Sequence, residues 1–157
     1  MKNVYQLADL ANRKTLDAGS VKAARLAVIG HPVSHSASPQ MHQAALDDQG
    51  LDLRYIRLDI APGDVAEAIS RMRDLNFVGC NVTIPHKFEA IKSCDQLSAD
   101  AEALKTVNTI IFGEQIYGHN TDAYGFVKAI REEFGVDLGD LRVMIVGAGG
   151  GAGRAIA

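Results

Sequence analysis

Short apolar segments alternate with amphipathic ones along almost the whole of this 157-residue chain. Residues 26–30 are apolar on both faces, as expected for a strand buried in a parallel sheet. Further strand-like segments lie at residues 53–60, 77–83, 107–112, 115–117 and 143–146. Gly113 and Glu114 separate two of these segments as a two-residue hairpin loop would, which predicts one antiparallel strand. The sequence therefore predicts an α/β fold, with an open, mostly parallel sheet and helices on both faces.

Helical patterns fill the intervals between most of these strands. They are predicted over the first twenty residues, from Ser38 to about Gly50, after Asp64, from Pro85, and from Asn120 to about Phe134. Ser38 is expected to be an N-cap, with Pro39 as the first helical residue. Asp64 and Glu67 form a capping-box pattern, and Gly135 can end the last helix.

The bulk properties exclude several classes of protein. A formal net charge of -3 argues against nucleic acid or an anionic membrane as the main partner. No apolar run approaches the ~20 residues of a membrane span, and no signal-peptide core is present, so a cytoplasmic location is predicted. Cys80 lies in an apolar run and is predicted to be a buried packing residue, whereas Cys94 is either inert or a reactive thiol. The histidines and cysteines lack metal-ligand spacing, so no metal site is predicted.

Four polar stretches follow predicted strands, at residues 31–39, 81–87, 107–109 and 119–122. In an open parallel sheet, ligands bind beyond the carboxyl ends of the strands. The stretches offer hydroxyls, amides, one ammonium and one carboxylate, which suit a small polyhydroxylated carboxylic acid. Each residue also has a purely structural explanation: Ser38 as an N-cap, Asp122 as a favourable charge at a helix start, and Asn108 as a turn residue.

Lys87 is less easily explained by structure alone. In the first turn of the helix predicted after Pro85, its charge would oppose the helix dipole. That position favours the neutral amine, which a catalytic proton acceptor needs. The alternative is a solvated surface lysine.

A glycine-rich segment follows the last apolar strand pattern. It fits the G-x-G-x-x-G/A pattern of dinucleotide-binding loops with Gly147, Ala148, Gly149, Gly150, Gly151 and Ala152. The preceding apolar segment and the helical pattern after it favour cofactor binding over a flexible linker. The residues that would read the cofactor ribose belong about 20 positions further on, so a truncated dinucleotide domain is expected.

Taken together, the motifs resemble the shikimate dehydrogenase family. They are GHPVSHSASP at 30–39, NVTIPHK at 81–87, VNTI at 107–110, NTD at 120–122, and the glycine loop from 147. The resemblance implies NADP-dependent, reversible reduction of 3-dehydroshikimate to shikimate. It also implies that Ser36 and Ser38 hold the substrate carboxylate, that Thr83 and Asn108 contact ring hydroxyls, and that Lys87 and Asp122 contact the substrate as the catalytic pair.

The same resemblance suggests three regions. Residues 1–24 are predicted as an N-terminal helical extension, 25–140 as the shikimate-binding catalytic domain, and 141–157 as the start of an NADP-binding Rossmann domain. Two alternatives remain open: a quinate/shikimate dehydrogenase that uses NAD, and a substrate-binding module without turnover. The expected partner is a small-molecule substrate, and a homodimer is compatible with the sequence.

Overall fold

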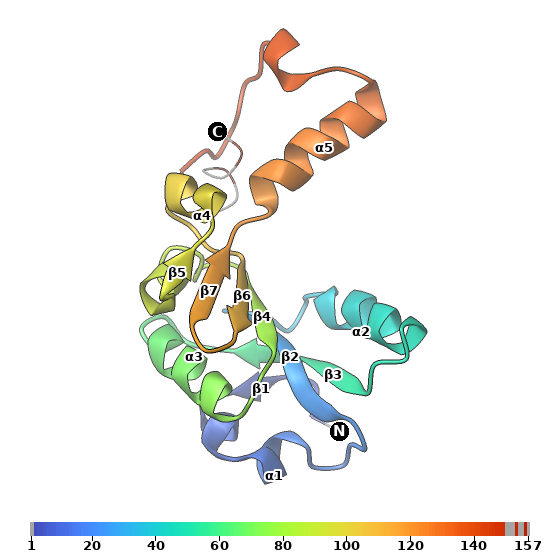
Figure 1. The fold of residues 1–157 in the computed structure, drawn as a ribbon, viewed down its shortest axis with the longest axis vertical. Coiled ribbons are helices and arrows are strands. Elements are labelled where there is room, and N and C mark those ends of the chain that lie inside the picture. Colours follow the sequence, from blue (N-terminus) through green and yellow to red (C-terminus); the bar gives the residue numbers. More distant parts are fainter. Residues whose placement is uncertain (1, 150–152, 154–155, 157) are drawn as a thin grey trace.

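The described part of the chain is organised around one mixed sheet of seven strands, in the order β1-β3-β2-β4-β6-β7-β5 (Figure 1). This computed structural model describes residues 2–149, 153 and 156. The strands are β1 (Tyr5–Gln6), β2 (Ala23–Gly30), β3 (Leu53–Asp59), β4 (Gly79–Val82), β5 (Gln96–Leu97), β6 (Thr109–Phe112) and β7 (Ile116–His119). Among them only β6 runs antiparallel to its neighbours. The predicted α/β fold with a mostly parallel sheet is confirmed.

Helices connect most of the parallel strands. The α-helices are α1 (Arg13–Leu16), α2 (Ser38–Asp48), α3 (Val65–Asp74), α4 (Ala99–Leu104) and α5 (Asp122–Phe134). Short 3-10 helices lie at η1 (Leu7–Ala11), η2 (Ala90–Ser93) and η3 (Leu138–Asp140). The hairpin between β6 and β7 is confirmed, but its register pairs Phe112 with Ile116, so its loop has three residues instead of the predicted two.

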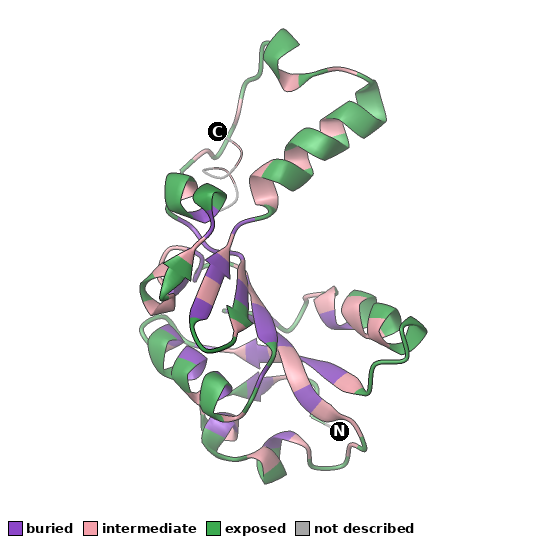
Figure 2. Ribbon diagram, viewed as in Figure 1, coloured by how far each residue is buried: buried purple, intermediate pink, exposed green. Residues whose placement is uncertain are grey.

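The two faces of the sheet are covered unequally, as the burial pattern shows (Figure 2). Side chains alternate along each strand, so Ile56 and Leu58 of β3 point to one face and Tyr55 to the other. The first face packs against α3 and the N-terminal segment and holds most of the buried apolar residues. The second packs against α2 through a small cluster around Val28 and Tyr55. Helices on both faces thus agree with the prediction.

The N-terminal segment is not the single helix that the sequence pattern predicts. Tyr5–Gln6 is instead a strand that pairs in parallel with the end of β3, followed by the two short helices η1 and α1. Tyr5, Leu10 and Leu16 join the main core and are at most 2% exposed. The helical prediction was wrong because backbone pairing with β3 and tertiary packing outweigh local helical periodicity.

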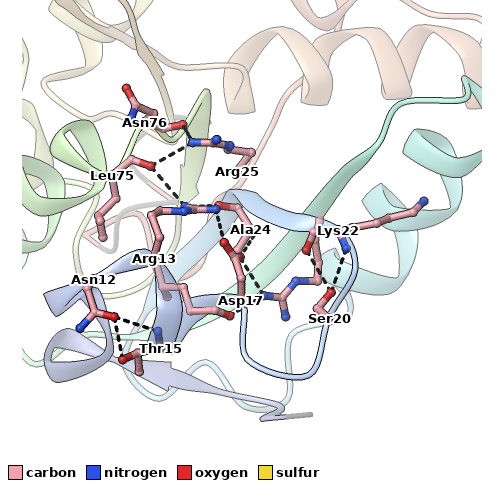
Figure 3. Close-up of polar contacts among 12 residues, drawn as sticks. Asn12, Arg13, Thr15, Asp17, Ser20, Lys22, Ala24, Arg25, Leu75 and Asn76 are labelled. Atoms are coloured by element: carbon pink, nitrogen blue, oxygen red, sulfur yellow. Dashed lines mark hydrogen bonds and ion pairs between the residues drawn. The ribbon is translucent and has the colours of Figure 1, made fainter.

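Hydrogen bonds from two arginines, Arg13 and Arg25, connect the N-terminal segment, β2 and the residues after α3 (Figure 3). Arg13 donates to the carbonyl oxygens of Ala24 (2.7 Å) and Leu75 (3.2 Å) and to the Asp17 carboxylate (2.8 Å). Asp17 in turn accepts from the backbone N–H of Ala24 (2.8 Å). Arg25 donates to the carbonyl oxygen of Leu75 as well (3.1 Å). The carbonyl oxygen of Leu75, just after α3, therefore accepts hydrogen bonds both from Arg13 of the N-terminal segment and from Arg25 of β2.

The last helix behaves as predicted at both ends, but the segment after it does not. Helix α5 starts at Asp122 and ends at Gly135, which takes a left-handed conformation (φ 66°) that favours glycine. It projects away from the sheet (Figure 1) and has no buried residue. Residues 143–146, predicted as a strand, form none, and Met144 is 87% exposed. A strand needs neighbours to satisfy its backbone, and among the described residues none pairs with this segment.

Burial makes both cysteines poor nucleophiles. Cys80 is 4% exposed, as predicted for a packing residue, and its pKa is raised by burial. Burial, and secondarily the Asp95 carboxylate, raise the pKa of the half-buried Cys94 to about 11 from an ordinary 9.0. At pH 8 we expect Cys94 to react with a disulfide reagent at least about tenfold more slowly than an unfolded control, because its lower thiolate fraction outweighs the greater nucleophilicity of its thiolate, with the rate still rising above pH 9. A rate that levels off near pH 9 would contradict this.

Candidate active site

The polar stretches predicted as ligand-binding meet at one edge of the sheet. The parallel strands β2, β4 and β7 end there, and because β6 runs the other way, its first residue lies at the same edge. Backbone hydrogen bonds join the connecting loops: His31 N–H donates to the Ile84 carbonyl (3.1 Å), and Val107 N–H donates to the Lys87 carbonyl (2.9 Å). The reversal of β6 is what brings Asn108 next to loops that follow parallel strands.

Lys87 and Asp122 form a close ion pair at this edge. The Lys87 Nζ lies 2.6 Å from Asp122 Oδ2, although the residues are 35 positions apart. The Lys87 side chain is 10% exposed and that of Asp122 24%, so the pair is shielded yet reachable from one side. A partly buried lysine held by one carboxylate is suited to exchanging a proton with a bound hydroxyl.

Asn108 fixes the orientation of the Asp122 carboxylate. Its Nδ2 donates to Asp122 Oδ1 and to Thr121 Oγ1, both at 2.9 Å. Its Oδ1 accepts from the Thr121 backbone N–H (3.1 Å) and from the Thr109 hydroxyl (2.9 Å). With Asn108 on one oxygen and Lys87 on the other, the carboxylate of Asp122 cannot rotate without losing a hydrogen bond.

The position of Lys87 comes from a turn and not from the helix predicted after Pro85. Residues 84–89 form consecutive turns, and the next helical element, η2, begins only at Ala90. The helix-dipole argument for Lys87 therefore fails. His86 holds the turn instead: its ring is fully buried, and its Nε2 donates to the Ile60 carbonyl (2.7 Å) beyond the end of β3.

Ser36 and Ser38 lie together in the loop after β2. The Ser36 hydroxyl donates to Ser38 Oγ (3.1 Å) and accepts from the Ser38 backbone N–H (3.3 Å). The predicted N-cap role of Ser38 is wrong, because Ala37 is the N-cap and Ser38 is the first residue of α2. Its hydroxyl is therefore not engaged in capping, and the partly buried pair retains hydroxyl hydrogen for an outside acceptor.

Thr83 lies between the loop of Ser36 and Ser38 and the turn that carries Lys87. It directly follows β4, and its backbone N–H donates to the Ile29 carbonyl of β2 (2.9 Å). A Cβ atom placed on Gly30 would lie only 2.5 Å from Thr83 Cγ2. Glycine at position 30 thus allows the ends of β2 and β4 to approach closely, which places Thr83 between the serine loop and the turn of Lys87.

The sequence did not predict the contacts of a polar chain behind the site, although Asn81 and Asn120 lie in two of the predicted ligand-binding stretches. The Tyr55 hydroxyl donates to Asn81 Oδ1 (2.7 Å), and Asn81 Nδ2 donates to the Thr109 hydroxyl (3.3 Å) that contacts Asn108. Asn120, fully buried, accepts from the backbone N–H of Asp122 (2.9 Å). In the sequence, the one indication that these asparagines belong to the site is that Asn81 lies two positions before Thr83 and Asn120 two positions before Asp122.

The glycine loop is only partly described by the structure. Gly147 has a positive φ of 85°, and a Cβ on Gly153 would lie 2.3 Å from the Gly147 carbonyl oxygen. The loop therefore folds back on itself in a way that side chains would block. The predicted cofactor residues Gly150, Gly151 and Ala152 lie outside the described residues. Gly147, Ala148 and Gly149 form turns, and their predicted role stays a prediction.

Other features of the described chain lie away from this edge. A cavity of about 850 Å³ lies between α2, β3 and the N-terminal segment, and none of the six predicted substrate residues lines it. Among the described residues, no cluster of acidic, histidine and cysteine side chains is arranged to hold a metal ion. Within the same part of the chain, no helix has the length and apolarity to cross a bilayer.

The chain is similar to known proteins in both sequence and structure. The chain is 46% identical over 126 residues to an NADP-dependent shikimate dehydrogenase of Methanopyrus kandleri, an alignment covering 80% of this chain and 43% of that protein. The structure matches shikimate 5-dehydrogenase of Thermus thermophilus in complex with shikimate, with a TM-score of 0.77 and 38% identity, covering 85% and 51% of the two chains. The same enzyme in complex with NADP(H) and shikimate gives a TM-score of 0.73 with 37% identity, over 85% and 50%.

The matched regions show which part of these relatives the chain corresponds to. It spans less than half the length of the curated relatives that it matches first. The model of the shikimate dehydrogenase substrate binding domain matches residues 28–110, which hold five of the six predicted substrate residues. The resemblance seen in the sequence is confirmed, and the chain belongs to the shikimate dehydrogenase substrate-binding-domain family.

Proposed function

We propose that the chain is the substrate-binding, proton-transferring half of a shikimate dehydrogenase, which reversibly reduces 3-dehydroshikimate to shikimate with NADP. The observation that carries this proposal is the 2.6 Å contact between Lys87 and Asp122, braced by Asn108 in a chain of this family. The remaining predicted contacts, Ser36 and Ser38 for the carboxylate and Thr83 for a ring hydroxyl, lie in loops at the same edge.

The chemical step that this half of the enzyme would carry out is the transfer of one proton. When shikimate is oxidised, a hydroxyl group must lose its proton as the carbon loses a hydride. Lys87 would exchange that proton at Nζ, and Asp122 would hold the ammonium in place through Oδ2. Asn108, bound to Oδ1, would keep the carboxylate aligned throughout the exchange. In the reduction direction the same pair returns the proton to the oxygen.

The cofactor would be held beyond this edge by the glycine loop. Gly147, with its positive φ, and Gly153, whose close approach to Gly147 excludes a side chain, fit a loop that lets backbone N–H groups reach a pyrophosphate. NADP would supply the hydride acceptor. A Methanopyrus relative and the Thermus structure, both named with NADP, support this choice of nucleotide.

A quinate/shikimate dehydrogenase that uses NAD is the second candidate. The resemblance of the paired serines in Ser36-Ala37-Ser38 to the family motif favours shikimate over a substrate with an additional ring hydroxyl. The test is to assay the full-length protein with each pairing of shikimate or quinate and NADP or NAD. A higher kcat/KM for quinate with NAD would overturn the primary proposal. A homodimer and a cytoplasmic location stay predictions.

The 157-residue polypeptide itself offers a direct test. We expect it to bind shikimate weakly, in the millimolar range, and to reduce no NADP, because most residues expected to bind the cofactor lie beyond the glycine loop. Ser36→Ala should weaken shikimate binding further, since one carboxylate donor is lost. Shifts of amide resonances on titration with shikimate measure both affinities. Turnover by this polypeptide, or unchanged binding in Ser36→Ala, would contradict these assignments.

A further inference from the structure

An arginine on β3 holds the serine loop from its backbone. Arg57 donates from Nε (2.9 Å) and from Nη2 (2.6 Å) to the carbonyl oxygen of Ser36. Its Nη2 also donates to Gln40 Oε1 (2.8 Å) in the first turn of α2. The planar guanidinium thus ties the loop and the start of the helix to one side chain, although Arg57 and Ser36 are 21 positions apart in the chain.

Among the described residues, Arg57 has no ion-pair partner. Its partners, a carbonyl and an amide oxygen, are neutral. Across the part of the chain that the structure describes, no carboxylate lies within 4.0 Å of its guanidinium. Asp59, two residues further along the same face of β3, contacts His31 Nδ1 instead (2.6 Å). Lys87, the cation of the catalytic pair, is already matched by Asp122.

We propose that Arg57 is a positioning residue for carboxylate recognition, which fixes Ser36 through its carbonyl and supplies the positive charge that the two serine hydroxyls lack. This inference rests on the proposed function. Hydroxyl dipoles alone discriminate little between an acid and its neutral ester, whereas a fixed cation beside them favours the anion. Because Arg57 is already bound to Ser36, its charge is held in place before the substrate arrives.

The test compares shikimate with its neutral methyl ester. Arg57→Ala should weaken shikimate binding about tenfold, the size expected for losing a charge-assisted interaction, and weaken binding of the ester only about two- to threefold, because the ester loses the positioning of Ser36 but no charge contact. Arg57→Lys should recover most of the affinity for shikimate because it keeps the charge, whereas Arg57→Gln should not. Added salt should weaken shikimate binding to the wild type more than to Arg57→Ala. In the full-length protein the effect should appear in KM, with kcat little changed.

Arg25→Ala is the matched control. Arg25 lies near the start of β2, and its hydrogen bonds within the described part of the chain also go to carbonyl oxygens, those of Leu75 and Asn76 just after α3 (Figure 3). It should leave shikimate affinity unchanged, and circular dichroism confirms that each variant is folded. Equal loss of acid and ester in Arg57→Ala, or full affinity in Arg57→Gln, would overturn the role of the charge. If the wild type binds neither compound, the proposed function itself fails, and the role of Arg57 falls with it.

Discussion

Replacing Lys87 with alanine should lower the turnover number of the full-length protein about 10²-fold or more, the size expected when a general acid–base group is removed. The Nζ that contacts Asp122 at 2.6 Å is lost, so no side-chain amine remains to exchange the hydroxyl proton. Substrate affinity should change less, because the serine loop and Thr83 remain in place. Reduction of NADP in the presence of shikimate, followed by absorbance, gives both kcat and KM.

Two further variants make this result interpretable. Lys92→Ala removes an exposed lysine from η2, a few residues away, and should leave kcat unchanged. Asp122→Asn keeps the shape of the side chain but removes the charge that holds Lys87, and should also lower turnover about 10²-fold. Near-normal turnover in both Lys87→Ala and Asp122→Asn would remove the proposed pair from the mechanism.

Replacing Leu16 with alanine should destabilise the protein by about 3 kcal/mol, within the range measured for deleting buried leucine side chains. Leu16 is fully buried and belongs to the main core, although it lies in the N-terminal segment that the sequence suggested to be an extension. Alanine is a better helix former than leucine, so the loss would come from the cavity and not from α1 itself. Urea unfolding followed by circular dichroism measures the change in the free energy of unfolding.

Val21→Ala provides the control within the same segment. Val21 is 99% exposed, so its truncation should change the free energy of unfolding by less than about 0.5 kcal/mol. A Leu16→Ala variant as stable as the Val21→Ala variant would mean that the N-terminal segment does not share the core of the sheet. A large loss would show that residues 1–24 and the rest unfold as one unit.

Local patterns in the sequence predicted the elements whose signals lie within a few neighbouring residues. The apolar pattern of β2 is of this kind, and Gly135 ends α5 with the predicted backbone conformation. Helices α2 and α5 begin near the predicted residues, although the predicted N-cap of α2 was wrong. Such signals arise from burial and capping, which act over one or two turns of chain. Local patterns failed where an element depends on a strand far away in the sequence. Residues 5–6 form β1 because they pair with β3, whereas residues 143–146 form no strand because no described strand pairs with them.

The candidate site likewise combines features that could be predicted from the sequence with features that only the structure shows. The sequence by itself determined which side chains are available: Ser36 and Lys87 lie within the residues that match the family model, and Asp122 stands in the Asn-Thr-Asp motif beyond them. Only the tertiary structure decided how Lys87 is held, by a turn anchored through the buried His86, and that the reversed β6 delivers Asn108 to Asp122. The physical reason is that these contacts join residues between 14 and 35 positions apart, and no local periodicity records such hydrogen bonds.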